Sequence, residues 1–206
     1  MTTLPDQLNE NYNLTFLEKF IQYDKDLFVF LNGLGTENWD SFWMTVTNQF
    51  SWIPLYLLFF YLIFKSLGWK KGIAVLFLTA VLVTFSDQLT VFIKNFFERL
   101  RPNRDPSINE FIRILKNNKS FSFVSGHATT STAVSLFMHL TLKKNYRFTI
   151  LFFIWPVLFA YSRIYIGVHF PLDVTVGALL GMLIGFIFYK LSLRLISKMD
   201  SKKLVV

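Results

Sequence analysis

The sequence predicts an all-α membrane protein, a polytopic bundle of about five transmembrane helices, six at most, preceded by amphipathic helices. Hydrophobic residues make up 53% of the 206 residues and charged residues only 17%, whereas about 25% of the residues in soluble domains are charged. Apolar segments that approach the roughly 20 residues needed to cross a bilayer recur along the chain. Their polar residues lie mainly near the segment ends. The length suits one compact helical domain.

The N-terminal segment, residues 1–42, is predicted to lie in the membrane interface. Apolar residues recur there at helical spacing from Leu17 to Leu31, and charged residues interrupt them. This pattern is typical of one or two amphipathic helices, which we expect to break at the Gly-Leu-Gly of residues 33–35. A sixth, poorly hydrophobic span is the alternative. Residues 1–13 are polar and lack the basic and apolar regions of a cleavable signal peptide.

Five apolar segments form the predicted transmembrane catalytic domain, residues 43–196. They are residues 43–64, 72–93, 126–142, 148–166 and 172–189, the last extending as far as Ile196. Asp87 interrupts the second segment, and Arg163 lies near the end of the fourth. Residues 197–206 form a basic tail. The long polar connection at residues 98–125 is of a length that is usually functional in a compact domain.

Charge asymmetry predicts the topology. The net charge of +8 could indicate nucleic acid, anionic lipid or an anionic substrate as a partner, and positive-inside topology is the favoured explanation. The turns at 65–71 and 143–147 and the C-terminal end carry eleven Lys and Arg but a single acid, Asp200. By the positive-inside rule this side is cytoplasmic, so the N-terminus, the 98–125 loop and the 165–172 turn are extracytoplasmic. We expect a multi-pass protein of the inner (cytoplasmic) membrane. The chain has no cysteine, which excludes disulfides and thiolate chemistry.

Eight reactive residues fall at the predicted extracytoplasmic ends of four spans. They are Lys94, Arg101, Ser125, Gly126, His127, Arg163, His169 and Asp173. A charged group within a membrane costs a few kcal/mol at mid-span and normally faces a polar cavity. We therefore expect these residues to share one pocket that faces the periplasm or the cell exterior.

The first group is a pair of cations, Lys94 and Arg101. They are seven residues apart, so on a helix they share one face, and Pro102 is expected to end that helix. Two cations on one face suit a multiply charged oxyanion, and Arg adds bidentate geometry. The alternative is a pair of long side chains that snorkel at a helix end.

The second group, Ser125-Gly126-His127, follows a polar loop and precedes a helical run. Ser is a favoured N-cap residue. Unpaired amides at a helix N-terminus bind phosphate oxygens, and Gly lets the anion approach closely. The alternative is an ordinary helix cap.

The third group is His169 and Asp173, which flank Pro171. Pro favours the first turn of a helix, so Asp173 is expected in a first turn, within reach of the His169 ring. A carboxylate on one imidazole nitrogen fixes the tautomer and makes the other nitrogen a better nucleophile. The alternative is an acid that complements the helix dipole beside an interfacial His.

The histidines divide into a reactive pair and a bystander. His127 and His169 are two of only three in the chain, and one can attack phosphorus while the other protonates the leaving oxygen. His139 is expected to be interfacial or packed, without a catalytic role. Asp87, seven residues before Lys94, is expected to be a buried supporting partner of Lys94 or Arg163.

Together these groups resemble the type 2 phosphatidic acid phosphatase (PAP2) superfamily, whose pattern is K-x6-R-P, P-S-G-H and S-R-x5-H-x3-D. The corresponding segments here are Lys94-NFFERL-Arg101-Pro102, Val124-Ser125-Gly126-His127 and Ser162-Arg163-IYIGV-His169-FPL-Asp173. The motifs span residues 94–173, in the family's order. Val124 stands where the family usually has Pro, and no catalytic group is lost.

The resemblance implies a bacterial membrane lipid phosphatase that works through a phosphohistidine. His169 would be the nucleophile, Asp173 would orient it, and His127 would protonate the leaving group and later activate water. The phosphoryl oxygens would be held by Lys94, Arg101, Arg163, Ser125 and the Gly126 amide. The family needs no metal or other cofactor, and no His, Asp and Glu cluster has obvious metal-ligand spacing.

The expected partners are the bilayer and a phosphorylated lipid, with no nucleic acid. The lipid candidates are undecaprenyl diphosphate, phosphatidate or phosphatidylglycerophosphate, and a lipid A phosphate. The small chain and the outward-facing site favour undecaprenyl diphosphate or a related envelope lipid. A phosphotransferase with the same phosphohistidine is the runner-up, and a non-catalytic phospholipid binder or flippase is the alternative from another class. A soluble haloperoxidase shares the motifs, but five apolar spans argue against it.

Overall fold

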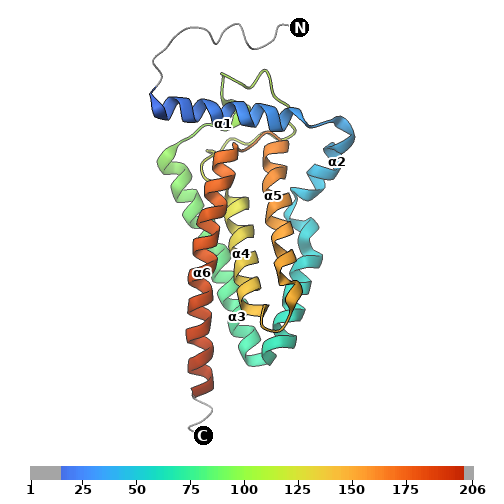
Figure 1. The fold of residues 1–206 in the computed structure, drawn as a ribbon, viewed down its shortest axis with the longest axis vertical. Helices are drawn as coiled ribbons and strands as arrows, with labels where there is room; N and C mark the ends of the chain where they lie inside the picture. The colour runs from blue at the N-terminus through green and yellow to red at the C-terminus, as the bar shows by residue number, and fades with distance from the viewer. Residues whose placement is uncertain (1–14, 202–206) are drawn as a thin grey trace.

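The computed structural model describes residues 15–201, which form α-helices and 3₁₀ turns with no strand among them. Helix α1 (Phe16–Gly33) lies across one end of the bundle formed by the other long helices (Figure 1). Thr15 and Glu18 begin it with a capping box, in which each side chain accepts a hydrogen bond from the other residue's backbone. The predicted all-α class is confirmed.

Helix α1 is amphipathic, as predicted. Its exposed face carries large apolar side chains: Phe16, Phe20, Tyr23, Leu27 and Phe30. The opposite face buries Asp24, Phe28 and Asn32, which are spaced four residues apart and point towards the bundle. The helix ends at Gly33, and α2 (Glu37–Val46) follows after a short turn. A helix that lies across the end of a bundle and carries an apolar face along its length suits a position in the membrane interface.

Helix α3 (Ile53–Phe97) consists of two arms that fold back on each other at Gly68. Gly68 has φ 70° and ψ 177°, a backbone conformation open essentially only to glycine. The arms match the predicted spans 43–64 and 72–93, but the first arm begins later than predicted. Asn48 ends the preceding helix, because its side chain accepts a hydrogen bond from Phe50 N (3.0 Å) and begins the 3₁₀ turn η2 (Gln49–Trp52).

The remaining helices run along the bundle. They are α4 (Gly126–Leu142), α5 (Ile154–Tyr165), which continues the 3₁₀ segment η4 (Arg147–Phe153), and α6 (Pro171–Ser201). The 31 residues of α6 extend for about 46 Å, longer than the roughly 30 Å hydrocarbon core of a bilayer. The predicted domain boundaries at residues 42 and 196 stay predictions, and α2 and α6 run across them.

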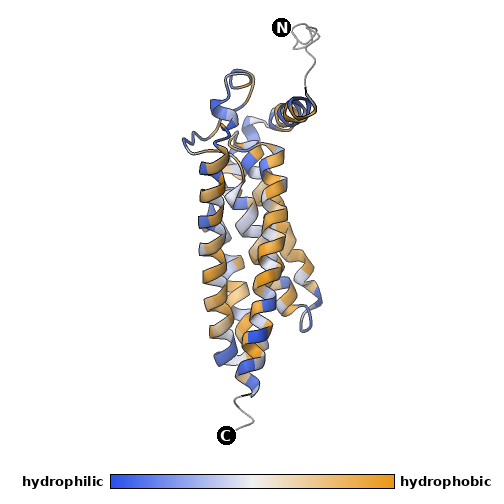
Figure 2. Cartoon of the chain, turned by 90° about the vertical axis from the view of Figure 1, so that its left-hand side faces the viewer, coloured by the Kyte–Doolittle hydropathy of each residue, from blue (hydrophilic) through white to orange (hydrophobic). Residues whose placement is uncertain are grey.

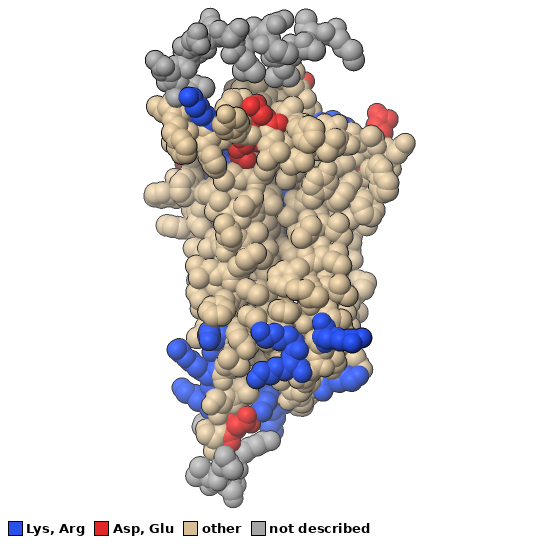
Figure 3. Space-filling model, viewed as in Figure 1, with Lys and Arg blue, Asp and Glu red and all other residues tan. Residues whose placement is uncertain are grey.

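Three stretches of the described chain are long and apolar enough to cross a membrane: residues 49–104, 147–165 and 171–201. The first contains both arms of α3. Apolar residues cover the sides of the bundle and hydrophilic ones gather at its ends (Figure 2). The protein is therefore a multi-pass membrane protein, whereas the number of spans, five or six, stays a prediction. On the face shown in Figure 3, Lys and Arg gather at the end opposite α1.

Helices α4 and α6 pack closely through a glycine stripe on α6: Gly177, Gly181 and Gly185. A Cβ on the first would lie 2.8 Å from Ser125 O, and one on the last 2.5 Å from Ala133 O. Small residues four apart let two membrane helices approach backbone to backbone. The contact places the first turn of α6 against the first turn of α4.

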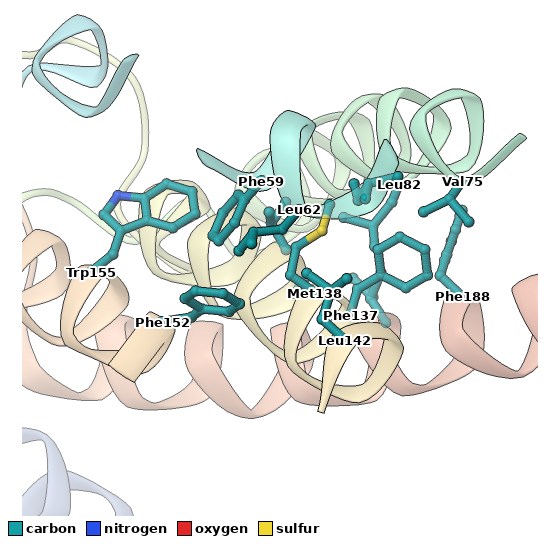
Figure 4. Packing of buried hydrophobic residues seen from close by; sticks show 14 of the residues in the cluster. Phe59, Leu62, Val75, Leu82, Phe137, Met138, Leu142, Phe152, Trp155 and Phe188 are labelled. Carbon is teal, nitrogen blue, oxygen red and sulfur yellow. The ribbon is translucent and has the colours of Figure 1, made fainter. Parts of the chain in front are cut away.

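One apolar core joins both arms of α3 to the other helices (Figure 4). Phe59 and Leu82 belong to different arms and meet Phe137 of α4, Trp155 of α5 and Phe188 of α6 in this cluster. The core occupies the middle of the bundle, so polar side chains at the α1 end are held on rigid helix termini.

Candidate active site

Seven of the eight predicted site residues lie in or beside the terminal turn of a long helix, at helix ends that meet at the α1 end of the bundle (Figure 1), and Arg101 lies in the loop after α3. Lys94 is in the last turn of α3, and Arg163 is in the last turn of α5. Ser125 caps α4, and Asp173 is in the first turn of α6. The structure brings these termini together, whereas the chemical role of each residue stays a prediction.

His169 and Asp173 form a buried pair, with exposed fractions of 1% and 0%. The ring Nδ1 lies 3.3 Å from Asp173 Oδ2, which also accepts hydrogen bonds from Phe170 N (2.9 Å) and from the Ser122 hydroxyl. A proton on Nδ1, donated to this carboxylate, leaves the lone pair on Nε2. That Nε2 lies 3.2 Å from Arg101 Nη1.

Arg101 is held rigidly beside His169. Its Nη1 donates to Val168 O (2.8 Å), and its Nε and Nη2 donate to the carbonyl and hydroxyl oxygens of Ser120 (2.8 and 2.9 Å). The prediction that Arg101 continues the helix of Lys94 is wrong. Glu98 adopts a left-handed conformation (φ 48°) that ends α3 at Phe97, so the two cations approach the site from a helix and from a loop.

Arg163 has a buried guanidinium that is only partly satisfied. Its Nη1 donates to Thr47 Oγ1 (2.7 Å), while its Nε has no hydrogen-bond partner within residues 15–201. Its carbonyl accepts hydrogen bonds from Val168 N (3.1 Å) and His169 N (3.3 Å). The backbone of Arg163 thus fixes the loop of His169, and its Nε is a buried donor that has no partner within residues 15–201.

The N-terminus of α4 provides the opposite wall of the site. Ser125 N donates to Asp173 O (3.0 Å), which joins this terminus to α6. A Cβ on Gly126 would lie 3.9 Å from Lys94 Nζ, so the ammonium lies beside the free amides of the first turn. Helix amides and a neighbouring cation together make an anion site.

His127 lies on this wall and packs against the Phe159 ring, with centroids 4.9 Å apart. Arg163, His169 and Lys94 are within electrostatic range of its ring. His139 lies elsewhere, as expected, with its Nδ1 3.0 Å from Thr149 Oγ1. It is twelve residues further along α4, which is about 18 Å along the helix axis.

The site opens into an apolar cavity of about 900 Å³ between the two arms of α3 and the helices α4 and α5. Lys94, Gly126 and His127 line one end of this cavity. Leu76 and Met138 line the part furthest along the helices, and Met138 is about 17 Å from His127 by helical rise. The cavity therefore pairs a cationic end with a long apolar wall.

Asp87 differs from its predicted role. It is exposed to the cavity rather than buried, and the one hydrogen bond of its carboxylate within the described chain is a long one from Gln88 Nε2 (3.5 Å). No ion pair joins Asp87 to Lys94 or to Arg163 within residues 15–201. Asp87 is thus a cavity-lining acid and not the buried partner of a cation.

Sequence reasoning missed Arg99. Its Nη1 donates to Asp173 Oδ1 (2.8 Å) and its Nη2 to Asp24 Oδ2 of α1 (2.6 Å). The guanidinium also lies 4.0 Å from the centre of the Phe170 ring. The available signal was a second Arg two residues before Arg101. Its partner Asp24 lies 75 residues away along the chain, and spacing gave no reason to connect them.

The loop before Ser125 is anchored on both sides of Val124, the residue that departs from the family pattern. Ser122 N donates to Arg99 O (2.8 Å), and Val124 itself is buried (1% exposed). Within residues 15–201, no group of three His, Asp or Glu side chains could hold a metal ion. The metal-free chemistry nevertheless stays a prediction.

Comparisons with known proteins agree with this architecture. The model of the PAP2 superfamily matches residues 72–197. The lipid A 4'-phosphatase of Bacteroides thetaiotaomicron is 29% identical over 189 residues, covering 90% of this chain and 84% of that protein. The undecaprenyl-diphosphatase of Sulfolobus acidocaldarius is 32% identical over 171 residues, covering 83% of this chain and 74% of that protein.

A crystal structure shares the fold. The transmembrane PAP2-type phosphatidylglycerolphosphate phosphatase from Bacillus subtilis superposes with a TM-score of 0.67 and 22% identity, over 85% of this chain and 87% of that one. The family match covers more than half of the chain and includes all eight residues gathered at the α1 end. The chain therefore belongs to the PAP2 superfamily and is a membrane lipid phosphatase.

Proposed function

We propose that this phosphatase hydrolyses the phosphate of a bacterial envelope lipid through a phosphohistidine on His169, at the extracytoplasmic face of the inner membrane. The observation that carries the proposal is the geometry of the His169 ring. Its Nδ1 lies 3.3 Å from Oδ2 of the Asp173 carboxylate, and its Nε2 lies 3.2 Å from Nη1 of the Arg101 guanidinium. A nucleophilic nitrogen beside a phosphate-binding cation is the arrangement that phosphoryl transfer requires.

In the first step, the lipid phosphate binds between Arg101, the free Nε of Arg163, Lys94 and the first amides of α4. His169 Nε2 attacks phosphorus, the bond from phosphorus to the lipid oxygen breaks, and protonated His127 gives its proton to that oxygen. The cations and amides stabilise the charge that builds on the equatorial oxygens. The products are a phosphohistidine, a neutral His127 and a lipid with a free hydroxyl, or with its remaining phosphate if the substrate is a diphosphate.

In the second step, neutral His127 accepts a proton from a water molecule as that water attacks phosphorus. The phosphorus–nitrogen bond breaks, and inorganic phosphate and the original His169 are released. One group serves as acid and then as base, which returns the enzyme to its starting protonation state. Asp173 keeps the His169 ring in one tautomer during both steps.

The apolar cavity is where we place part of the lipid's hydrocarbon. Its cationic end at Lys94 and His127 holds the phosphate, and its wall of apolar side chains extends for about 17 Å beside α4. An extended hydrocarbon segment lying along such a wall would be largely removed from water and from the headgroup region. The cavity would bring the lipid phosphate to Lys94, Gly126 and His127, which are the site residues that line it.

Among the candidate lipids, we place a lipid A phosphate first. The relative of that name matches 90% of this chain. Undecaprenyl diphosphate, which the small chain and outward-facing site favoured, comes second, because the relative of that name matches 83% of this chain. Either lipid would have to present its phosphate on the outer side of the inner membrane, because the basic residues lie at the opposite end of the bundle (Figure 3).

The test is phosphate release by the purified protein from a panel of these lipids in mixed micelles. His169→Ala is expected to abolish release, whereas His139→Ala, a matched histidine loss at a packed position, is expected to retain most of it. Full activity of His169→Ala would overturn the proposed chemistry. Consumption of lipid phosphate without free phosphate, but with a newly phosphorylated lipid, would instead indicate a phosphotransferase.

A second arm tests the covalent intermediate. With ³²P-labelled lipid and rapid quenching, the chain is expected to carry an acid-labile, alkali-stable label that is absent from His169→Ala. His127→Ala is expected to turn over slowly, because it lacks both the acid for the first step and the base for the second. A label that persists in His169→Ala would assign the nucleophile elsewhere.

A further inference from the structure

We propose that Asp24 and Arg99 are positioning residues for the His169–Asp173 pair, and that they make the interfacial helix α1 part of the active-site scaffold. The inference rests on the proposed role of His169 as nucleophile. It adds two residues that the three motifs do not specify: Arg99, at a variable position of the first motif, and Asp24, on the amphipathic helix α1.

The two oxygens of the Asp173 carboxylate have separate partners, and Arg99 is the partner of Oδ1, whereas Ser122, Phe170 and His169 contact Oδ2. Asp173 Oδ2 lies 3.3 Å from His169 Nδ1 and accepts a hydrogen bond from Phe170 N. Its Oδ1 accepts Arg99 Nη1 at 2.8 Å. A carboxylate held at both oxygens cannot rotate without losing a partner, so Arg99 at Oδ1, together with Phe170 N and the Ser122 hydroxyl at Oδ2, fixes the plane in which Asp173 meets the imidazole.

Arg99 is itself fixed from two directions. Its Nη2 donates to Asp24 Oδ2 at 2.6 Å, and its guanidinium lies 4.0 Å from the centre of the Phe170 ring. A planar guanidinium suits this position, because it presents separate N–H groups to two carboxylates while it stacks on an aromatic ring. Lysine carries the same charge, but its single ammonium group cannot present separate N–H donors to both carboxylates in this planar arrangement.

Asp24 also holds the start of α6. Its Oδ1 accepts a hydrogen bond from Leu172 N at 2.8 Å. Leu172 is in the first turn of α6, where amides lack partners within the helix, and a carboxylate there acts as an N-cap. Phe170, which precedes α6, has no side-chain acceptor for this task, so α1 supplies the cap from elsewhere in the chain.

The burial of Asp24 argues that this contact is specific. Its neighbours on α1 at the membrane-facing side are apolar and exposed, whereas Asp24 is only 7% exposed and faces the bundle. Burying a carboxylate is costly unless it is paired and hydrogen-bonded, and both of its oxygens are used here. The chain of contacts therefore runs from α1 through Arg99 and Asp173 to the nucleophilic ring.

A general docking contact of α1 provides the matched control. Lys25, the next residue, pairs with Asp105 at 2.8 Å and with Ser107 at 2.9 Å, and neither partner contacts Asp173 or His169. Desolvation opposes ionisation of Asp105, but hydrogen bonds from Lys25 and Ser107 outweigh it and hold the pKa of Asp105 below its usual value. Lys25→Ala thus removes an α1 tether of similar type without touching the proposed chain of contacts.

The experiment compares Asp24→Asn, Arg99→Lys and Lys25→Ala in the full-length protein. Asn keeps an oxygen for Leu172 N but removes the charge that faces Arg99. For Asp24→Asn and Arg99→Lys we expect kcat to fall by about tenfold or more, with KM changed by less than about twofold, as for other groups that orient a catalytic residue. Lys25→Ala is expected to keep kcat within about twofold of the original protein.

A spectroscopic readout makes the result independent of turnover. The chain has three histidines, so the ¹⁵N resonances of His169 can be assigned by comparison with His169→Ala. We expect one neutral tautomer, protonated at Nδ1, in the original protein and in Lys25→Ala, and a mixture of tautomers in Arg99→Lys and Asp24→Asn. Because this observation needs no substrate, it still tests the positioning role if His169→Ala shows that the nucleophile is a different residue.

Two results would overturn the inference. One is Asp24→Asn and Arg99→Lys with unchanged kcat and an unchanged His169 spectrum. The other is an equal loss of kcat and of thermal stability in Asp24→Asn and Lys25→Ala, which would make Asp24 an ordinary docking contact of α1.

Discussion

Replacing Gly181 by Ala tests whether close packing of α4 and α6 holds the active site together. A Cβ at this position would collide with Thr129 O and would lie 3.0 Å from Thr132 Cβ and 3.1 Å from Ala133 N. Two of these three atoms belong to the α4 backbone and cannot rotate away. The two helices must therefore separate by some tenths of an ångström along their shared length.

Two opposing effects set the magnitude. Overpacking a tight contact costs about 1–3 kcal/mol, and a collision with backbone atoms falls in the upper part of that range, at about 2–3 kcal/mol, whereas Ala is favoured over Gly within a helix by about 1 kcal/mol. The steric cost wins, and we expect a net destabilisation of about 1–2 kcal/mol. For a chain of this size that corresponds to a fall in Tm of about 2–8 °C.

The assay is thermal unfolding of purified protein in detergent, together with phosphate release. Gly33→Ala is the matched control, because a Cβ there meets nothing within 4 Å, and its Tm is expected to stay equal or rise slightly. Gly181→Ala should also lower kcat, since α6 carries Asp173 against α4. A Tm for Gly181→Ala at or above that of the original protein would refute the packing argument.

Three further outcomes follow from the cavity, the topology and the chemistry. Val83→Trp, at a residue that lines the cavity, should raise KM several-fold for long-chain lipids but not for a short water-soluble phosphate ester. Val81→Trp, at an exposed residue outside the cavity lining, should leave KM unchanged for both substrates. Equal effects of the two variants on KM would place the lipid elsewhere. Because the chain has no cysteine, Asn117→Cys should react with a membrane-impermeant maleimide added outside intact spheroplasts, whereas Lys144→Cys should react only after lysis; the reverse pattern would invert the proposed topology. Prolonged EDTA treatment should leave phosphate release unchanged, and loss of activity that a divalent ion restores would rule out the metal-free mechanism.

The sequence predicted the helical bundle and the residues near its active end for a simple physical reason. Spans of about 20 apolar residues alternate in direction, so the polar residues at every second boundary must lie on the same side. Lys94, His127, Arg163 and His169 could be placed at one end from that rule and from the charge asymmetry alone. Helix ends set by Pro171 and Ser125 were equally readable, because each is a local signal.

The features that the sequence did not predict depend on the path of the loops and on backbone conformations that no residue type signals. Glu98 ends α3 in a left-handed conformation that is unusual for its residue type. The helix predicted from the sequence, which continues to Arg101, is therefore too long. Arg99 gains its partners only because the loop turns back under α1. Helical facing predicts a cationic partner for Asp87, but facing alone does not tell whether a side chain is buried in the packed core or lines a cavity, as Asp87 does.

The central claim is that one phosphoryl group is held against His169 Nε2 by Arg101, Arg163, Lys94 and the α4 N-terminus. The most direct test is a structure of the protein with vanadate, which adopts the five-coordinate geometry of the transition state. We expect vanadium within bonding distance of His169 Nε2, opposite an oxygen that faces His127. Vanadate bound away from His169, or with His127 on the far side of the bundle, would contradict the account.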